Sequence, residues 1–329
     1  SRPVRRRPPA RQPPSRHPLR LFFPPSTTPA MLRVAACQLA PTEDLAANLA
    51  RARALVEDAA ARGATLIGLP ETFTTEYRLD LFPIAAEIIG QPDTGSGLLA
   101  ELAAKHRVTV FGGIVEKSSD GVLYNTAIAY GPEGELARYR KQHLSCVRVG
   151  PDATCEASVF AAGDDLAVFR VPTPGGGSLL AGLGICFDLR FGEVNRGYAA
   201  RGCDLVAYPS AFLESTGVKH WELLLRARAL DEQVFTLAPN HARSASQATK
   251  MFGHALACDP WGAVLASCGL EGDGVALAEL DLSALEIRTR IPLAEVRSCK
   301  RRRAGGAEEE KVEVANGVAA KRLEAAKGS

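Results

Sequence analysis

Between residues 32 and 69, two apolar β-type runs flank a long helical pattern. The first run is 32–39; residues 42–63 then carry Ala, Leu and Val at helical spacing and end at a glycine, and 65–69 is the second run. A strand, a helix and a strand in this order predict a parallel strand pair joined by a crossover helix. The chain is therefore predicted to adopt an α/β fold.

The same alternation continues to about residue 292, beyond which it fades. Further helices are expected at 94–106, 193–201 and 219–231, and further strands at 108–115, 124–130, 136–139, 166–171, 179–185, 205–208, 234–238, 255–259, 264–267 and 275–281. Residues 145–165 show no regular pattern and are predicted to be irregular. These elements can form one large α/β domain or two smaller ones.

Charge is distributed unevenly along the 329 residues, although the formal net charge is only +2. Residues 1–30 hold seven Arg and no acid, residues 300–329 carry a net +3, and residues 31–299 carry −8. The acidic body argues against nucleic acid as a partner, and no apolar run is long enough to span a membrane. We expect a disordered basic leader at 1–30, a folded domain at 31–295 and a charged disordered tail at 296–329.

The leader is rich in Arg, Pro and Ser. Arg and Ser without acids favour an organelle transit peptide, although the prolines disfavour the amphipathic helix of such a peptide. A fragmentary or mistranslated leader is the alternative. The expected location is accordingly the cytoplasm or, with a transit peptide, an organelle such as the mitochondrion or plastid.

The eight cysteines include no CxxC pair; they lie at positions 37, 146, 155, 186, 203, 258, 268 and 299. This spacing is neither that of a zinc site nor that of a small secreted disulfide framework. We therefore expect reduced thiols that pack as small hydrophobic groups, as in a reducing compartment. The sequence contains no metal, nucleotide or flavin motif, and we predict no cofactor.

Cys186 follows the apolar run 179–185 and precedes residues that suit the start of a helix. A cysteine at a strand-to-helix turn has its sulfur near backbone N–H groups and a helix dipole, and both favour the thiolate. Cys186 is therefore a candidate nucleophile. On this segment alone, a buried structural cysteine is an equally good interpretation.

Two ionisable residues also follow predicted strands, namely Glu71 after 65–69 and Lys141 after 136–139. Open α/β sheets gather functional groups beyond the carboxyl ends of their strands. A cysteine nucleophile needs a base and a group that protonates an amine leaving group. A solvated strand-end acid and a surface basic run are the alternatives for the two residues. Because Glu71, Lys141 and Cys186 each follow a predicted strand, a catalytic role for the three together is favoured.

The chain from Leu32 to about Pro292 resembles the nitrilase superfamily of carbon–nitrogen hydrolases. The shared motifs, in the family's order, are Leu69-Pro70-Glu71-Thr72-Phe73, Tyr139-Arg140-Lys141-Gln142-His143-Leu144, Gly184-Ile185-Cys186-Phe187-Asp188-Leu189-Arg190-Phe191, and Gly253-His254 with Asp259-Pro260-Trp261-Gly262. Features similar to the omega-amidase branch are Phe187 to Phe191, Tyr208 to Phe212, Thr216-Gly217 and His220-Trp221-Glu222. Residues 224–229 are also shared with the deaminated-glutathione amidases.

The resemblance implies an α-β-β-α sandwich, in which two facing sheets are each covered by a helix layer. It also implies amide hydrolysis through a thioester, with Cys186 as nucleophile, Glu71 as general base and acid, and Lys141 stabilising the oxyanion. Glu156 matches a second glutamate that helps to position Lys141, and a loop acid is its alternative interpretation. The family tends to form homodimers, so a homodimer is expected.

Arg190 and Thr216 match positions that hold the distal carboxylate of the substrate in omega-amidases. The implied substrates are small ω-amides of 2-oxo dicarboxylic acids, namely 2-oxoglutaramate and 2-oxosuccinamate. An arginine fork suits this role because it binds a carboxylate bidentately. The alternative is that Arg190 only forms an ion pair with Asp188 or Glu193.

Two rival functions stay open at this point. One is deaminated-glutathione amidase activity, and the other is a catalytically silent binding protein of the same family. Residues 145–149 depart from the family's usual aromatic and acidic stretch. In the family, the loop that contains these residues borders the substrate pocket. The sequence therefore does not decide which amide is the preferred substrate.

Overall fold

The computed structural model describes residues 31–147 and 154–303, so the leader and the end of the tail lie outside the described residues. The strands of the first sheet are β1 (Met31–Leu39), β2 (Leu66–Gly68), β3 (Thr109–Lys117), β4 (Leu123–Gly131), β5 (Gly134–Arg140), β12 (Asn240–His241) and β15 (Gly274–Asp281). Their order is β12-β1-β2-β3-β4-β5, and β15 also pairs with β1. β1 is parallel to β2, and β2 to β3, as the crossover predicted.

The second sheet has six strands in the order β14-β13-β11-β10-β9-β8. Its strands are β8 (Ala167–Pro172), β9 (Ser178–Leu183), β10 (Leu205–Ala207), β11 (Phe235–Ala238), β13 (Leu256–Cys258) and β14 (Val264–Ser267). β9, β10 and β11 are mutually parallel, and a separate ladder pairs β6 (Cys146–Val147) with β7 (Thr154–Cys155).

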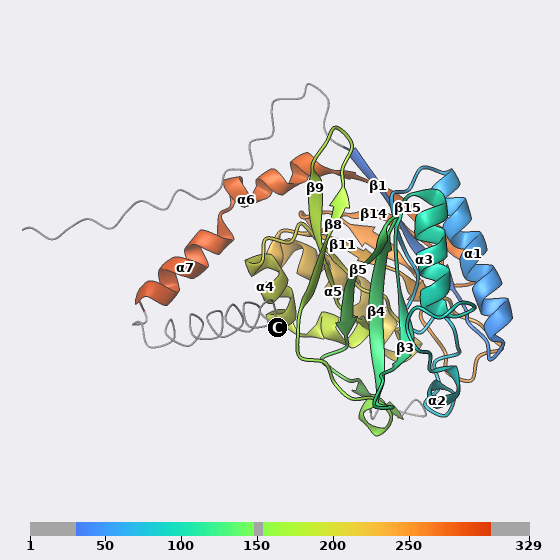
Figure 1. The fold of residues 1–329 in the computed structure, drawn as a ribbon. Coiled ribbons are helices and arrows are strands. Elements are labelled where there is room, and N and C mark those ends of the chain that lie inside the picture. The colour runs from blue at the N-terminus through green and yellow to red at the C-terminus, as the bar shows by residue number, and fades with distance from the viewer. Residues whose placement is uncertain (1–30, 148–153, 304–329) are drawn as a thin grey trace, which may run out of the picture.

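Helices cover the outer faces of both sheets. The α-helices are α1 (Leu45–Ala61), α2 (Phe82–Ala85), α3 (Gly95–His106), α4 (Gly192–Ala200), α5 (Glu214–Glu232), α6 (Ile287–Arg290) and α7 (Leu293–Arg303), and 3-10 turns include η2 (Glu156–Ser158), η3 (Cys186–Arg190) and η4 (Leu282–Glu286). Figure 1 shows α1 and α3 on one side of the strands and α4 on the other. None of the helices within the described ranges is long and apolar enough to cross a membrane.

β1 shows why the sheets stack, because its two faces are both apolar. Leu32 and Val34 belong to the core between the sheets, together with Leu205 of β10. Ala35 and Cys37 point the other way, into the core that α1 and α3 share with the first sheet. A strand with two buried faces needs a partner layer on each side. The result is the α-β-β-α sandwich implied by the family resemblance.

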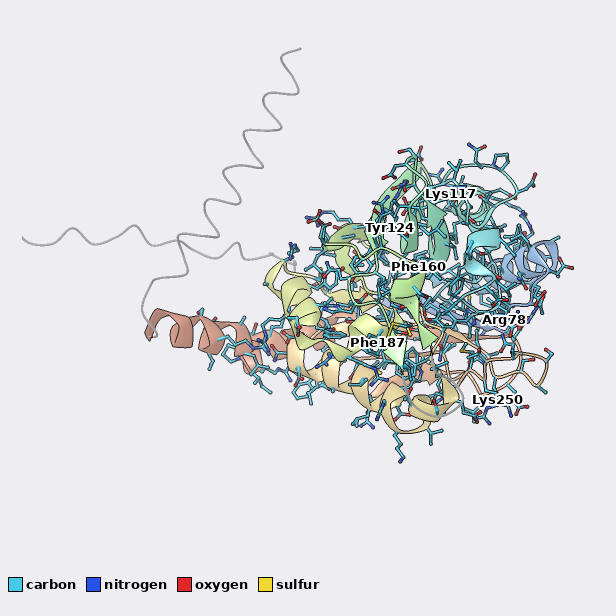
Figure 2. The ribbon with its side chains drawn as sticks, turned by 90° about the horizontal axis from the view of Figure 1, so that it is seen from below. Arg78, Lys117, Tyr124, Phe160, Phe187 and Lys250 are labelled. Atoms are coloured by element: carbon cyan, nitrogen blue, oxygen red, sulfur yellow. A yellow bond between two sulfur atoms is a disulfide. The ribbon has the colours of Figure 1, made fainter. Side chains whose placement is uncertain are left out.

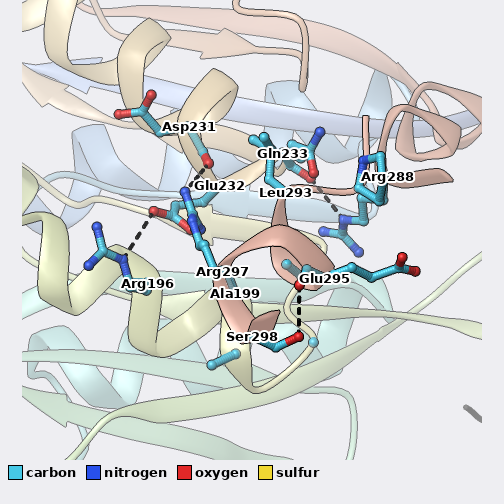
Figure 3. A pocket seen from close by; sticks show the side chains of 14 residues that line it. Arg196, Ala199, Asp231, Glu232, Gln233, Arg288, Leu293, Glu295, Arg297 and Ser298 are labelled. Carbon is cyan, nitrogen blue, oxygen red and sulfur yellow. Dashed lines mark hydrogen bonds and ion pairs between the residues drawn. The ribbon is translucent and has the colours of Figure 1, made fainter. Parts of the chain in front are cut away.

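The domain boundary that we expected at residue 295 falls inside α7, which runs from Leu293 to Arg303. Arg297 of α7 forms an ion pair with Glu232 at the end of α5 and donates to the Asp231 carbonyl at 2.8 Å. A charged composition predicts disorder only when the charges lack partners, and here an ion pair holds the helix. α7 and the adjacent ends of α4 and α5 line a cavity of about 770 Å³ (Figure 3).

Cys146 and Cys155 form a disulfide across β6 and β7. The expectation that every cysteine is a reduced thiol is therefore wrong for this pair. Residues directly opposite each other in an antiparallel ladder come close together whatever their spacing in the sequence. The same ladder gives short regular structure to part of 145–165, which we expected to be irregular. The cysteines at 37, 186, 203, 258 and 268 are free.

Candidate active site

Glu71 lies just beyond β2, at the carboxyl edge of the parallel strands, with its side chain fully buried. Gly113 of β3 makes this turn possible, because a Cβ there would lie 2.5 Å from the Glu71 Cα. The next residue, Thr72, has a φ of 41°, in the left-handed region. His241 Nε2 donates to the Glu71 carbonyl oxygen at 2.6 Å. A strained turn is thus held by close packing and a histidine.

Lys141 follows β5 and is also fully buried. Its Nζ donates to Glu71 Oε1 at 2.7 Å and lies 2.8 Å from Glu156 Oε2. Glu156 opens η2 and accepts from the Ser145 backbone N–H at 2.6 Å. Asn125 Nδ2 donates to both carboxylates, at 2.7 Å to Glu71 and 2.9 Å to Glu156. Two acids, a lysine and an amide therefore form one buried network.

Cys186 opens η3 with a φ of 41°, a conformation that costs a non-glycine residue about 1–3 kcal/mol. Its backbone N–H donates to the Pro209 carbonyl at 3.0 Å. The Ala211 N–H donates to Glu71 Oε2 at 2.7 Å. The Pro209 carbonyl and the Ala211 N–H belong to one short segment, which therefore bonds both Cys186 and Glu71, although these two residues come from different sheets. Figure 2 views the face of the molecule that carries Phe187, the residue after Cys186.

Burial and the Glu71 carboxylate raise the pKa of the Cys186 thiol well above its usual range, against the opposing effect of Lys141. We expected a helix terminus to favour the thiolate form of Cys186, and this expectation is wrong. η3 is a single 3-10 turn, and the thiol is buried near acidic side chains. Burial lowers the pKa of Lys141, but Glu156 and Glu71 outweigh it and raise the pKa well above its ordinary value. A protonated thiol near a carboxylate can pass its proton to that carboxylate.

Arg190 ends η3, four residues after Cys186, and its guanidinium is half-buried. Within the part of the chain that the structure describes, no carboxylate lies within 4.0 Å of it. The alternative in which Arg190 pairs with Asp188 or Glu193 is therefore wrong. Its Nε is buried and has no hydrogen-bond partner among the described residues. Burial without a counter-charge lowers the pKa of this guanidinium, which nevertheless stays charged at neutral pH.

Aromatic rings lie next to the Arg190 guanidinium. Nη1 donates to His220 Nδ1 at 3.1 Å, and the rings of Phe187 and Phe212 lie 5.4 and 5.1 Å from the guanidinium carbon. Thr216 lies one turn before His220 on α5, and therefore on the same face of that helix. The described residues show no hydrogen bond between Thr216 and Arg190.

Comparison with known proteins identifies the family. The sequence model of the carbon-nitrogen hydrolase family matches residues 33–287. The chain belongs to the carbon-nitrogen hydrolase family. Omega-amidase NIT2 of Mus musculus is 39% identical over 264 residues, which are 79% of this chain and 93% of that protein. Omega-amidase NIT2-A of Xenopus laevis is 40% identical over 249 residues, or 75% of this chain and 87% of that protein.

Solved structures of the nitrilase superfamily share the fold of this hydrolase. Saccharomyces cerevisiae Nit3, a member of that superfamily, matches with a TM-score of 0.71 and 33% identity, covering 80% of this chain and 95% of that one. The similarity to Nit3, the family match and the omega-amidase relatives together establish an amide-hydrolysing enzyme with the expected sandwich fold.

Two further residues bond Glu71 but were not predicted from the sequence, namely Asn125 and His241. Asn125 lies in β4, where asparagine is uncommon, and that position is the only local signal it gives. His241 follows the buried strand β11, so the strand-end rule that identified Glu71 could also have indicated it. Both contact the Glu71 segment and therefore belong to the support of the site.

His241 makes the stability of the hydrolase pH-dependent, because burial lowers its pKa from 6.5 to about 4. The unfolded chain takes up this proton near pH 6.5, whereas the folded chain resists until about pH 4. The stability contribution is thus fully present above pH 6.5 and is lost as the pH falls toward 4. We expect His241 alone to lower the free energy of unfolding by on the order of 3 kcal/mol across this window.

Urea unfolding at about pH 7.5 and pH 4.5 measures this effect. Other groups titrate in the same range, so the comparison is made with His241→Gln, which lacks the titrating ring. The wild type should lose more stability on acidification than the variant does. Equal losses in the two proteins would contradict the prediction.

Proposed function

We propose that this hydrolase cleaves ω-amides of 2-oxo dicarboxylic acids, such as 2-oxoglutaramate and 2-oxosuccinamate, to the acid and ammonia. The observation that carries the proposal is the Arg190 guanidinium, which lies four residues after Cys186 and meets no carboxylate within the described residues. A half-buried cation without a counter-charge is costly unless an anion comes to it. The distal carboxylate of the substrate can supply that anion. Similarity to omega-amidases supports this choice.

In the proposed acylation, the Cys186 sulfur attacks the amide carbon while Glu71 takes the thiol proton. The carbonyl oxygen becomes an oxyanion, stabilised by Lys141 Nζ and the Phe187 backbone N–H. Glu71 then gives the proton to the departing nitrogen as the C–N bond breaks. Ammonia leaves, and the acyl group remains on the sulfur as a thioester.

In the proposed deacylation, Glu71 takes a proton from a water molecule that attacks the thioester carbon. The second oxyanion forms at the same place and meets the same Lys141 ammonium. The C–S bond breaks, the proton returns to the Cys186 sulfur, and the dicarboxylic acid leaves. Glu156 supports both steps, because its carboxylate bonds the Lys141 ammonium and holds it in place together with Glu71.

A substrate comparison tests this function. Rates of ammonia release are measured with 2-oxoglutaramate, with deaminated glutathione and with butyramide, an uncharged amide of similar length. We expect kcat/KM for 2-oxoglutaramate to exceed that for butyramide by at least about 10²-fold, since one amide can use the arginine and the other cannot. Equal values for these two amides would contradict the proposal. A preference for deaminated glutathione would replace it with the other amidase branch.

We also propose that the hydrolase is a homodimer. Leu223 and Leu230 of α5 are 66% and 48% exposed, and Trp261 in the neighbouring turn is 49% exposed. The turn lies against α5, because Arg226 Nε donates to the Gly262 carbonyl at 2.8 Å. A second copy of the chain would cover this apolar surface. Light scattering should give twice the 34.9 kDa chain mass, and a monomer mass would contradict the proposal.

A further inference from the structure

The Asp188 carboxylate is fully buried, two residues after the nucleophile, and accepts hydrogen bonds at both oxygens. Oδ1 accepts from the His143 backbone N–H at 3.0 Å and from His143 Nδ1 at 2.8 Å. Oδ2 accepts from the Tyr139 hydroxyl at 2.8 Å and from the Ile185 backbone N–H at 3.0 Å. No lysine or arginine of the described residues lies within 4.0 Å of it. Four donors therefore converge on one carboxylate.

In the sequence, the hydrogen-bond partners of Asp188 lie next to Lys141 and Cys186. Tyr139 precedes Lys141 by two residues, and His143 follows it by two. Ile185 directly precedes the nucleophile. One carboxylate thus joins the segment that carries the lysine to the segment that carries the cysteine.

This link matters because the two segments belong to different sheets. Lys141 follows β5 of the first sheet, whereas η3 follows β9 of the second. Backbone ladders fix strands within a sheet, but facing sheets are held in place by their side chains. The His143 ring is itself stacked on Phe191, with ring centres 3.7 Å apart and planes inclined by 12°, so it is held in its donating position.

We propose that Asp188 is a positioning residue that sets the place of the Lys141 ammonium relative to the Cys186 sulfur. With the carboxylate in place, an oxyanion formed by attack of the sulfur meets the ammonium directly. Asp188 acts through these two residues and bonds the segments around them. The proposal rests on the proposed roles of Cys186 as nucleophile and Lys141 as oxyanion-stabilising group.

The decisive variant is Asp188→Asn, which keeps the shape but turns one oxygen into an NH₂ group that faces donors. We expect kcat for succinamate, the monoamide of a dicarboxylic acid, to fall at least about tenfold. The cysteine sulfur adds to the aldehyde carbon of succinic semialdehyde. The aldehyde oxygen then becomes an oxyanion at the place where the oxyanion forms during amide hydrolysis. Binding of this aldehyde should weaken by the same factor as kcat/KM. Alkylation of Cys186 by iodoacetamide forms no oxyanion and should slow by less than about threefold.

A purely structural role for Asp188 predicts another result. Alkylation, aldehyde binding and the melting temperature would then all fall together, and the proposal would be overturned. Unchanged kcat would overturn it as well. Tyr139→Phe provides a milder variant that removes one donor only, and should lower kcat/KM and aldehyde affinity equally, by about threefold. Tyr198→Phe is the matched control, a buried tyrosine whose hydroxyl bonds the Leu183 carbonyl instead.

These outcomes separate the positioning proposal from the proposed function. If Asp188→Asn does not fold, the Tyr139→Phe and Tyr198→Phe pair decides: equal kcat in the two would overturn the positioning role. A wild-type enzyme that releases no ammonia from 2-oxoglutaramate would contradict the substrate proposal. The positioning role is then measured with the amide that the wild type does cleave and with the aldehyde of the same carbon skeleton.

Discussion

Replacing Cys186 with Ala is expected to lower ammonia release from 2-oxoglutaramate by at least about 10⁴-fold. The thioester cannot form without the sulfur, and a water molecule would have to attack the amide directly. The buried Lys141 and Glu71 stay in place in this variant, because the change removes one sulfur atom at the edge of their network. The measurement is ammonia release under saturating substrate, with circular dichroism to verify the fold.

The matched control for Cys186→Ala is Cys268→Ala, a partly buried free cysteine near the end of β14. It should retain activity within about twofold, since it contacts no part of the network. Ammonia release retained by Cys186→Ala would rule out the thioester. Iodoacetamide at neutral pH separates the enzyme from a catalytically silent relative. It should label Cys186 first, because Glu71 can take the proton, whereas a silent member would show no preference.

Arg190→Met is expected to change which amide is cleaved. We expect kcat/KM for 2-oxoglutaramate to fall by about 10³-fold, because the distal carboxylate would be buried without a cation. Butyramide has no such carboxylate, and its kcat/KM should change by less than about fivefold. Methionine fills much of the space of the arginine stem, so the aromatic rings around it keep their packing. The ratio of the two kcat/KM values is the measurement.

Arg190→Lys serves as the control for charge alone. Lysine keeps the positive charge but has no planar guanidinium that can bind a carboxylate bidentately. The kcat/KM of Arg190→Lys for 2-oxoglutaramate should therefore lie between those of the wild type and Arg190→Met. If Arg190→Met lowers kcat/KM by the same factor for both amides, the arginine maintains the structure of the site but does not bind the distal carboxylate of the substrate. That result would refute the omega-amide proposal and leave the amidase chemistry untouched.

The fold class was predictable from the sequence because it depends on local patterns of apolar residues. The apolar runs at 32–39 and 65–69 and the helical pattern between them appear as β1, α1 and β2, within a few residues. The positions of Glu71, Lys141 and Cys186 at strand ends follow from the same patterns. The carboxyl ends of β2 and β5 lie at one edge of the first sheet, so Glu71 and Lys141 could be expected to meet, whereas Cys186 follows β9 of the second sheet.

The parts that could not be predicted depend on contacts between distant segments. The Ala211 N–H that bonds the Glu71 carboxylate is a backbone group, which every residue except proline possesses. The raised pKa of the Cys186 thiol comes from burial and a carboxylate on the facing sheet, and neither is visible at the strand-to-helix turn. The Cys146–Cys155 disulfide likewise depends on pairing that residue spacing does not show.

The pairing of β1 with β15 has a consequence for how the chain is made. The two strands run antiparallel, with Met31 opposite Asp281, so the first strand of the domain lies beside its last. During synthesis, β1 leaves the ribosome long before this neighbour exists, and its edge must stay unpaired meanwhile. Such non-local pairing slows folding and leaves nascent chains open to aggregation and chaperone binding.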